Sequence, residues 1–147
     1  DLLAAHPSDP ERVADGIADD AIVPRLAVRA CEVAVKRSPN EARFTFQLGR
    51  ALLAAKRREE AAQHLERAAQ RDYAAGLAYL GDAYQFGYGV KADSKRALEA
   101  YRKALARGFE PAEGQIEMLT FQADKYIRLY PTKAAPTPAL EKLASEN

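Results

Sequence analysis

The sequence predicts an all-α protein, a right-handed α-solenoid of stacked antiparallel helix pairs. Two observations support this prediction. Apolar residues recur at the i, i+4, i+7 spacing of helices along most of the chain, and no segment is patterned as a strand. Similar segments also recur at intervals of 32–36 residues, which is typical of stacked supersecondary units.

The internal repeat consists of two short motifs. The pair Leu48-Gly49 returns 32 residues later as Leu80-Gly81. A second motif has alanine at both ends and a larger residue between them, and it occurs at Ala27, Cys31 and Ala34, at Ala61, Leu65 and Ala68, and at Ala97, Tyr101 and Ala104. Each copy forms one apolar stripe on a helix, and its small residues let a neighbouring helix approach closely. We therefore expect Gly81 to lie at a close helix contact, which offsets the roughly 1 kcal/mol of helix propensity that glycine lacks relative to alanine.

The segment Gly-Tyr-Gly-Val (87–90) has two readings, a phosphate-binding loop or a turn. The Leu-Gly motif repeats after 32 residues and the alanine motif after 36, so four residues are inserted between the two helices. A phosphate loop needs a preceding strand, a third glycine and usually a Lys-Ser/Thr pair, and the sequence has none of these. We expect Gly87 and Gly89 to have positive φ in a turn, Val90 to return to the core, and Asp93 or Ser94 to cap the next helix.

These motifs resemble a known repeat family. Residues 80–108 read Leu-Gly-x-x-Tyr-x-x-Gly-x-Gly-Val-x-x-Asp-x-x-x-Ala-x-x-x-Tyr-x-x-Ala-x-x-x-Gly. This pattern is similar to the Sel-one-like repeat, a branch of the tetratricopeptide superfamily. The preceding unit (42–73) resembles a plain tetratricopeptide repeat, because it lacks the Gly-x-Gly-Val turn. The resemblance covers about residues 24–122 and implies a solenoid that holds a peptide or a partner helix on its concave face.

The same resemblance suggests a setting for the chain. Similar repeat regions occur in bacterial exported or multidomain proteins, which favours an exported or periplasmic location over a cytoplasmic one. Some of them carry a cysteine just before the stretch that matches residues 1–9, and Cys31 would pair with such a cysteine. The alternative is that Cys31 is a core residue, because it aligns with Leu65 and Tyr101. A start at Asp1, not Met, is compatible with a removed leader or an upstream domain.

Composition narrows the possible functions. The chain has 147 residues, a formal charge of +1, 29% charged and 48% hydrophobic residues, as in a soluble globular domain. No apolar run approaches the ~20 residues of a membrane span. Cys31 is the only cysteine, and His6 and His64 have no second ligand at metal-binding spacing. We expect no metal, no cofactor and no enzymatic activity, with His6 in a loop and His64 on the polar side of a helix.

Charge is distributed unevenly along the chain. Residues 1–22 have a net charge of −5, residues 23–71 have +6, and the remainder is balanced. The basic segment is either a solvated helix face, partly covered by the acidic segment, or a surface that attracts nucleic acid or an acidic partner. We favour the first reading, because no aromatic-rich basic motif accompanies the charge.

The chain divides into three parts. Residues 1–22 form an acidic lead-in with a short helix around Leu2–Ala5, residues 23–130 form the repeat solenoid, and residues 131–147 form a proline-containing tail. Within the solenoid, the spacing predicts helices near 24–36, 41–55, 58–71, 74–86, 94–107 and, after Pro111, up to Leu129.

The candidate binding surface is the concave face. The first helices of successive pairs line that face, and the family resemblance transfers its positions to Arg43, Phe46, Arg50, Leu53, Ala78, Asp82, Gln85, Phe86, Gly114 and Met118. Arg43 and Arg50 share a helix face and can hold carboxylates, with Phe46 between them as a stacking surface. The alternative is that these are ordinary solvent-facing residues, with Phe46 closing the edge of the core.

Two functions are open at this point. The first is a protein-interaction scaffold that binds a peptide or partner helix without turnover. The second is a module that binds a polymer, either nucleic acid through residues 23–71 or a cell-wall glycan. Catalysis is disfavoured, because Asp82 and Glu117 are the only carboxyls near the predicted groove. The partner's identity and the oligomeric state do not follow from the sequence.

Overall fold

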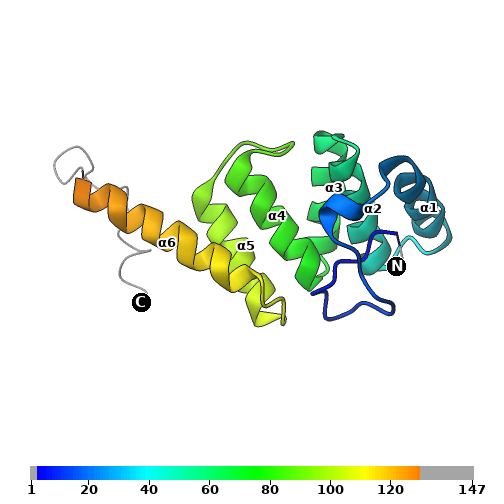
Figure 1. Ribbon diagram of the computed structural model, residues 1–147, viewed down its shortest axis with the longest axis horizontal. Coiled ribbons are helices and arrows are strands. Elements are labelled where there is room, and N and C mark those ends of the chain that lie inside the picture. The colour runs from blue at the N-terminus through cyan, green and yellow to red at the C-terminus, as the bar shows by residue number, and fades with distance from the viewer. Residues whose placement is uncertain (1–2, 130–147) are drawn as a thin grey trace.

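The computed structural model describes residues 3–129, and every regular element in that range is helical (Figure 1). The expected all-α class is therefore confirmed for this part of the chain. A short 3-10 helix, η1 (Asp19–Ala21), precedes six α-helices. Their bounds are α1 (Pro24–Arg37), α2 (Ala42–Ala54), α3 (Arg58–Ala69), α4 (Ala74–Phe86), α5 (Ser94–Ala106) and α6 (Ala112–Leu129).

The helix ends lie where the sequence predicts them, and local chemistry explains why. Pro24 occupies the first turn of α1, where its missing N–H is not needed. Gly87 ends α4 in the left-handed conformation, and Gly89 also has a φ of 70°. Asp93 caps α5, because its Oδ1 accepts a 3.0 Å hydrogen bond from the Arg96 amide. The Gly-x-Gly segment is therefore a turn, as expected. A side chain at Gly89 would overlap the carbonyl of Arg58.

The repeated glycines lie at close helix contacts, as the repeat motif predicts. A Cβ atom placed on Gly49 of α2 would lie 2.9 Å from Leu65 of α3. The equivalent atom on Gly81 of α4 would lie 2.6 Å from the ring of Tyr101 of α5. Both distances are too short for a side chain, so the glycines let each first helix approach the large residue of its partner.

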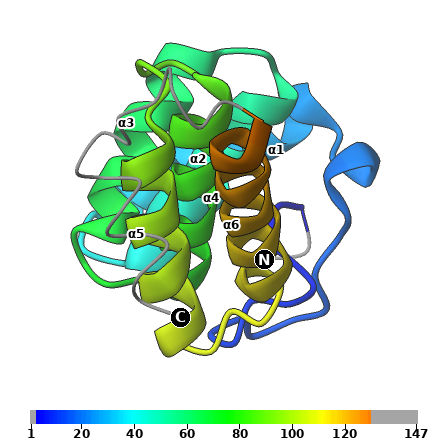
Figure 2. The same ribbon diagram turned by 90° about the vertical axis from the view of Figure 1, so that its left-hand side faces the viewer.

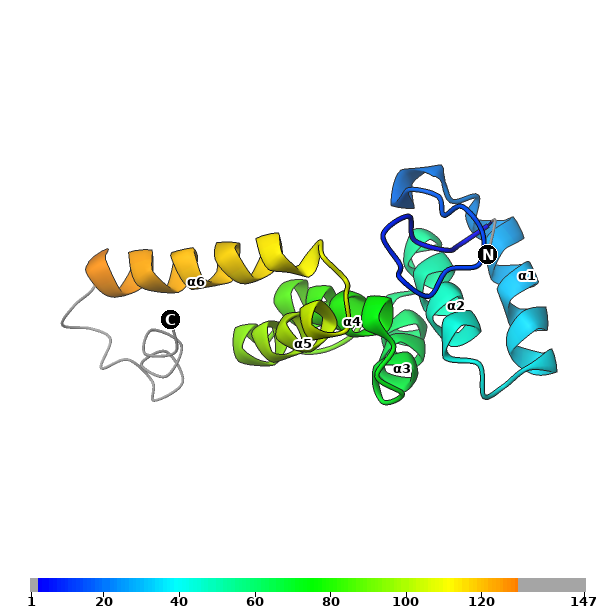
Figure 3. The same ribbon diagram turned by 90° about the horizontal axis from the view of Figure 1, so that it is seen from below.

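The helices follow one another as neighbours. The contacts of α2 with α3 and of α4 with α5 are the most extensive, and α3 also packs on α4. At the ends of this row, α1 contacts mainly α2 and α6 contacts mainly α5, so the two lie at opposite ends of the molecule (Figure 1). We call the side of α2 and α4 that carries the segment before α1 the inner face. Figures 2 and 3 show α6 on this same side.

Two apolar clusters form the core. One is centred on α4 and α5 and contains Phe46, Tyr73, Tyr84 and Tyr101. The other is centred on α1 and α2 and contains Val28, Cys31, Leu48 and Leu52, together with Ala4 from the chain before α1. Cys31 is buried, as predicted from its alignment with Leu65 and Tyr101.

The segment before α1 differs from the sequence-based prediction. Residues 3–5 form a turn and irregular backbone, so the short helix expected around Leu2–Ala5 is wrong, although Leu2 itself lies outside the described residues. Ala4, Ala5 and Asp9 are almost completely buried. The segment is therefore packed into the fold. The tail predicted for residues 131–147 also lies outside the described residues.

Candidate functional site

Arg50 of α2 anchors the N-terminal segment to the inner face. Its guanidinium donates hydrogen bonds to the carbonyls of Ala5 at 2.7 Å and Ile17 at 2.6 Å, with a longer one to Ala4. Its Nε lies 2.6 Å from Asp19 Oδ1 in an ion pair. Because the Arg50 side chain is fully buried and all three nitrogens have acceptors, this charge is satisfied by the chain itself.

Tyrosines extend this attachment along α4. The Tyr79 hydroxyl donates to Asp19 at 2.7 Å, and the Tyr73 hydroxyl, from the residue before α4, donates to the buried carboxylate of Asp9. The His6 ring packs against Tyr79 and Phe109 at centroid distances of 5.8 and 5.2 Å. Burial and the nearby Arg50 charge lower the pKa of His6, so it is neutral at physiological pH.

Two of the predicted binding residues are therefore not accessible from solvent. Phe46 is 0% exposed and contacts the rings of Tyr73 and Tyr79. Arg50 is 1% exposed and holds the N-terminal segment. The expectation that both are open to a partner is corrected, because residues 3–22 cover this half of the inner face. Arg50 does bind a carboxylate, as its chemistry predicts, but the carboxylate is Asp19 of the same chain.

The rest of the inner face contains an open hollow of about 550 Å³. We call it the Asp82 hollow. Its lining comes from η1, α2, the start of α3, α4, α6 and two turns: Asp19, Arg50, Leu53, Ala54, Lys56, Arg58, Tyr79, Asp82, Phe86, Tyr88 and Gln115. A smaller hollow of about 150 Å³ shares Asp19, Tyr79, Asp82 and Gln115 with it. The two hollows meet over α4, between the N-terminal segment and α6, which lie to either side of α4 in Figure 3.

Asp82 is the residue of this hollow whose pKa shifts into the mildly acidic range. Desolvation raises its pKa to about 6, and the Asp19 carboxylate acts in the same direction. The Tyr101 hydroxyl opposes this shift, because it lies 2.7 Å from Asp82 Oδ1 and stabilises the charged form. The same hydroxyl lies 2.6 Å from Gln85 Oε1, so its one proton is shared between two acceptors. Asp82 is thus charged at neutral pH and neutralises in mild acid.

Gln115 of α6 adds an acceptor that has no donor. Its Oε1 is buried, and no described residue donates a hydrogen bond to it. Gln115 lines both hollows together with Asp82. A buried acceptor without a donor costs about 1–3 kcal/mol. A bound group that brings N–H donors to Gln115 and Asp82 would remove that cost.

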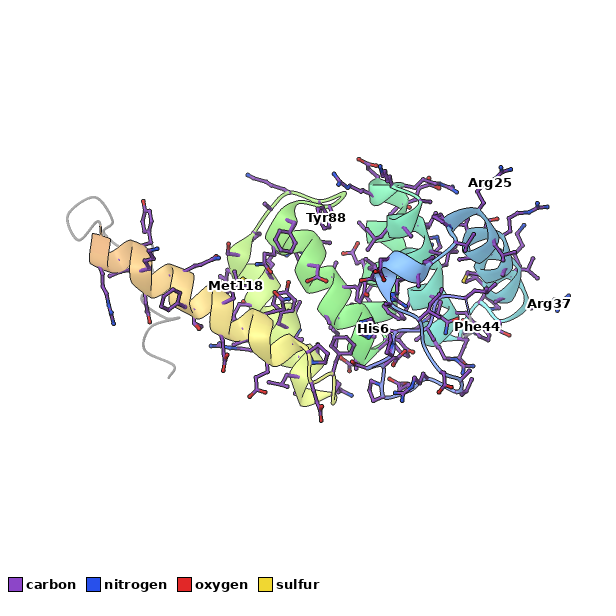
Figure 4. The ribbon with its side chains drawn as sticks, viewed as in Figure 1. His6, Arg25, Arg37, Phe44, Tyr88 and Met118 are labelled. Carbon is purple, nitrogen blue, oxygen red and sulfur yellow. The ribbon has the colours of Figure 1, made fainter. Side chains whose placement is uncertain are left out.

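The rim of the hollow combines aromatic rings and cations. Phe86 is 52% exposed and stacks on Tyr88 at a centroid distance of 5.5 Å. The Arg58 guanidinium lies over the Tyr88 ring, 4.8 Å from its centroid. Figure 4 shows Tyr88 in the turn that follows α4. The stacked rings of Phe86 and Tyr88 offer an apolar surface next to the acceptors of Asp82 and Gln115.

The remaining predicted residues lie in different places. Arg43 is half-buried, with its guanidinium 4.9 Å from the ring of Phe44, and it does not line the Asp82 hollow. Ala78 lines only the smaller hollow. Gly114 and Met118 are exposed on α6 and line neither hollow. Leu53, Asp82 and Phe86, with the buried Arg50 at their edge, are the predicted residues that the structure brings together in the Asp82 hollow.

Several lining residues were missed by sequence analysis. Tyr79, Asp82 and Phe86 follow i, i+3, i+7 spacing and share one helix face. A predicted face drawn through these residues, and not through Ala78 and Gln85, would have included Tyr79. Tyr88 and Lys56 lie in turns and Arg58 is the first residue of α3, and helical periodicity does not place such positions on a shared face. Asp19 and Gln115 reach the hollow through tertiary contacts that carry no local sequence signal.

The second histidine lines neither hollow. His64 is half-buried on α3 and lies 3.1 Å from Arg67. Residues 3–129 contain no group of three or more His, Cys, Asp or Glu side chains arranged to hold a metal ion. None of the helices described is both long and apolar enough to span a bilayer.

No protein-family model, no curated protein and no solved structure matches this chain.

Proposed function

We propose that this chain is a non-catalytic interaction module, a short tetratricopeptide-like α-solenoid of Sel-one-like repeat type that binds a peptide in the Asp82 hollow. The bound segment presents an N–H donor, from a Lys, an Arg or the main chain, to Asp82 and Gln115. An apolar side chain of the same segment packs on Phe86.

One observation carries this proposal. Among the described residues, the buried Gln115 Oε1 has no donor, and it lies in a hollow that it shares with the Asp82 carboxylate and the exposed Phe86 ring. Acceptors of this kind favour a donor-bearing ligand, and the hollow's volume is in the range of about 300–1,000 Å³ that ligand-binding pockets have.

The repeat architecture supports a peptide over a small molecule. Gly49 and Gly81 permit two equivalent close helix pairs, and their first helices, α2 and α4, form the inner face. The hollow is open and extends toward α6 through the smaller hollow, so an elongated ligand fits along it. Residues 3–22 already lie along the other half of the same face, held by Arg50.

Peptide selection with matched variants tests this function. A random peptide display library is selected on the wild-type chain, and enriched peptides are synthesised and titrated by fluorescence anisotropy. Phe86→Glu removes the apolar rim, and Asp82→Asn removes the charge while keeping the shape. Each should weaken binding at least about tenfold, equal to about 1.4 kcal/mol. Glu99→Lys, an exposed change on α5, is the control and should leave binding unchanged. No enrichment, or equal affinity for all four proteins, would reject the proposal.

A further inference from the structure

The outer face of α1 carries an exposed apolar stripe. Val23 at its N-cap, Leu26 and Val33 are 60%, 54% and 47% exposed, and Ala30 between them is also exposed. The spacing from Leu26 through Ala30 to Val33 is i, i+4, i+7, so these side chains lie on one face. This helix is at one end of the molecule, where Arg25 and Arg37 project away from the other helices (Figure 4).

The internal repeat shows that this stripe is not a general property of these helices. The positions that correspond to Leu26 are Glu60 in α3 and Arg96 in α5. Those that correspond to Val33 are Arg67 and Lys103. All four of these charged residues are exposed. The same helix face is therefore solvated in α3 and α5 but apolar in α1, which indicates that a partner covers it.

The charge around the stripe is positive, which favours a partner surface of negative charge. Helix α1 contains Arg25, Arg29, Lys36 and Arg37 against the single acid Glu32, a net charge of +3. At the opposite end of the molecule, residues 112–124 of α6 carry Glu113, Glu117 and Asp124 and no Lys or Arg, a net charge of −3. This part of α6 also exposes apolar side chains, with Met118 39% and Phe121 68% exposed.

We propose that copies of this chain associate head to tail, with the Leu26–Val33 face of α1 in one copy packed on the Met118–Phe121 face of α6 in the next. Apolar side chains meet at the centre, and the basic flank of α1 faces the acidic flank of α6. A symmetric contact between two α1 helices is disfavoured, because it would place two net charges of +3 against each other. A contact between two different patches is heterologous and produces open chains or a closed ring.

Sedimentation velocity of the full chain tests the association. We expect the average mass to rise above that of a monomer with concentration, with a Kd between about 10 µM and 1 mM, because two helix faces form a small interface. Raising the salt to about 1 M, where the Debye length is about 3 Å, should weaken the association. The double variant Leu26→Glu/Val33→Arg copies the residues that α3 has at these positions, so it should fold and remain monomeric. Glu66→Lys, exposed on α3, is the control and should associate like the wild type.

A mixing experiment identifies the geometry. Phe121→Lys blocks the α6 face but leaves α1 intact, and alone it should be monomeric. An equimolar mixture of Phe121→Lys with Leu26→Glu/Val33→Arg contains one intact α1 face and one intact α6 face. It should form a dimer and nothing larger. Circular dichroism checks that each variant keeps the helical content of the wild type.

Several results would overturn this proposal. A wild-type chain that remains monomeric at about 1 mM has no self-association of the proposed kind. If such a monomer binds vesicles rich in phosphatidylserine through Leu26 and Val33, the stripe is a membrane contact. Association of Phe121→Lys with itself, lost only in the α1 variant, would show a symmetric α1 contact. A mixture that stays monomeric while the wild type associates would also contradict the head-to-tail arrangement.

Discussion

Arg50 of α2 and Tyr79 of α4 converge on one carboxylate oxygen, because Arg50 Nε lies 2.6 Å and the Tyr79 hydroxyl 2.7 Å from Asp19 Oδ1. Arg50 Nε and the hydroxyl are themselves 3.0 Å apart. This contact joins two helix pairs to Asp19, which lies 31 residues before Arg50 and 60 residues before Tyr79. It closes one half of the inner face and leaves the other half open as the Asp82 hollow.

Replacing Arg50 should make the protein easier to unfold. Arg50→Ala leaves the carbonyls of Ala5 and Ile17 without their donor, so we expect the free energy of unfolding to fall by about 3 kcal/mol. Chemical denaturation measures the change. Arg25→Ala, an exposed substitution on α1, should remain within about 0.5 kcal/mol of the wild type. Equal stabilities of the two variants would show that the N-terminal segment does not depend on Arg50.

Two glycines of the chain should respond to alanine in opposite directions. Gly81→Ala places a methyl group 2.6 Å from the Tyr101 ring, and we expect it to destabilise the protein by about 1–3 kcal/mol. Gly114 has no neighbouring atom within 4 Å of such a methyl, so Gly114→Ala should stabilise α6 by up to about 1 kcal/mol. Thermal unfolding followed by circular dichroism compares them. A stabilising Gly81→Ala would contradict the close packing of α4 on α5.

Asp82 should make stability depend on pH in mild acid. Its pKa is about 6 in the folded chain, above the ordinary value of 3.8 that we expect in the unfolded chain. The folded state therefore binds the proton more tightly, and the stability that Asp82 contributes is greatest below pH 3.8 and declines as pH rises to about 6. Asp82→Asn removes this decline. Relative to the wild type, its unfolding free energy should rise between these two pH values and level off above them.

The opposite trend has a different meaning. If Asp82→Asn becomes less stable relative to the wild type as pH rises, the carboxylate is stabilised as a charge in the folded chain. The Tyr101 hydrogen bond would then outweigh desolvation.

Cys31 should react slowly with thiol reagents. Burial raises the pKa of its thiol to about 11, so little thiolate exists at pH 8, and the side chain is also inaccessible. We expect labelling by a disulfide reagent to be at least about a hundredfold slower in the native chain than in denaturant. Gln63→Cys in a Cys31→Ala background puts the thiol at an exposed position on α3 and should react rapidly. Rapid labelling of native Cys31 would show that the cluster around it opens easily.

The helices could be predicted from the sequence because their signals are local. Gly87 and Asp93 encode the end of α4 and the start of α5 through their own backbone and side-chain chemistry. The Gly81 contact could be predicted because the same motif recurs at Gly49. Each of these features depends on residues a few positions apart or on an internal repeat.

The site could be predicted only in part because its other determinants are long-range. The family resemblance implies that Asp82 and Phe86 lie on the concave face, and both line the hollow. It also places Arg50 there, but it does not show that the carbonyls of Ala5 and Ile17 satisfy this side chain. Irregular backbone carries no spacing rule, so the position of residues 3–22 depended on the tertiary structure.

The most direct test of peptide binding in the Asp82 hollow is its NMR footprint. The isotopically labelled chain is titrated with a selected peptide, and the backbone amide shifts are followed. Binding in the hollow predicts the largest changes at Asp82, Phe86, Tyr88 and Gln115, with those around Ala5 and Asp9 smaller, because the segment before η1 stays in place. Changes confined to α3 and α5, or release of residues 3–22 on binding, would contradict this account.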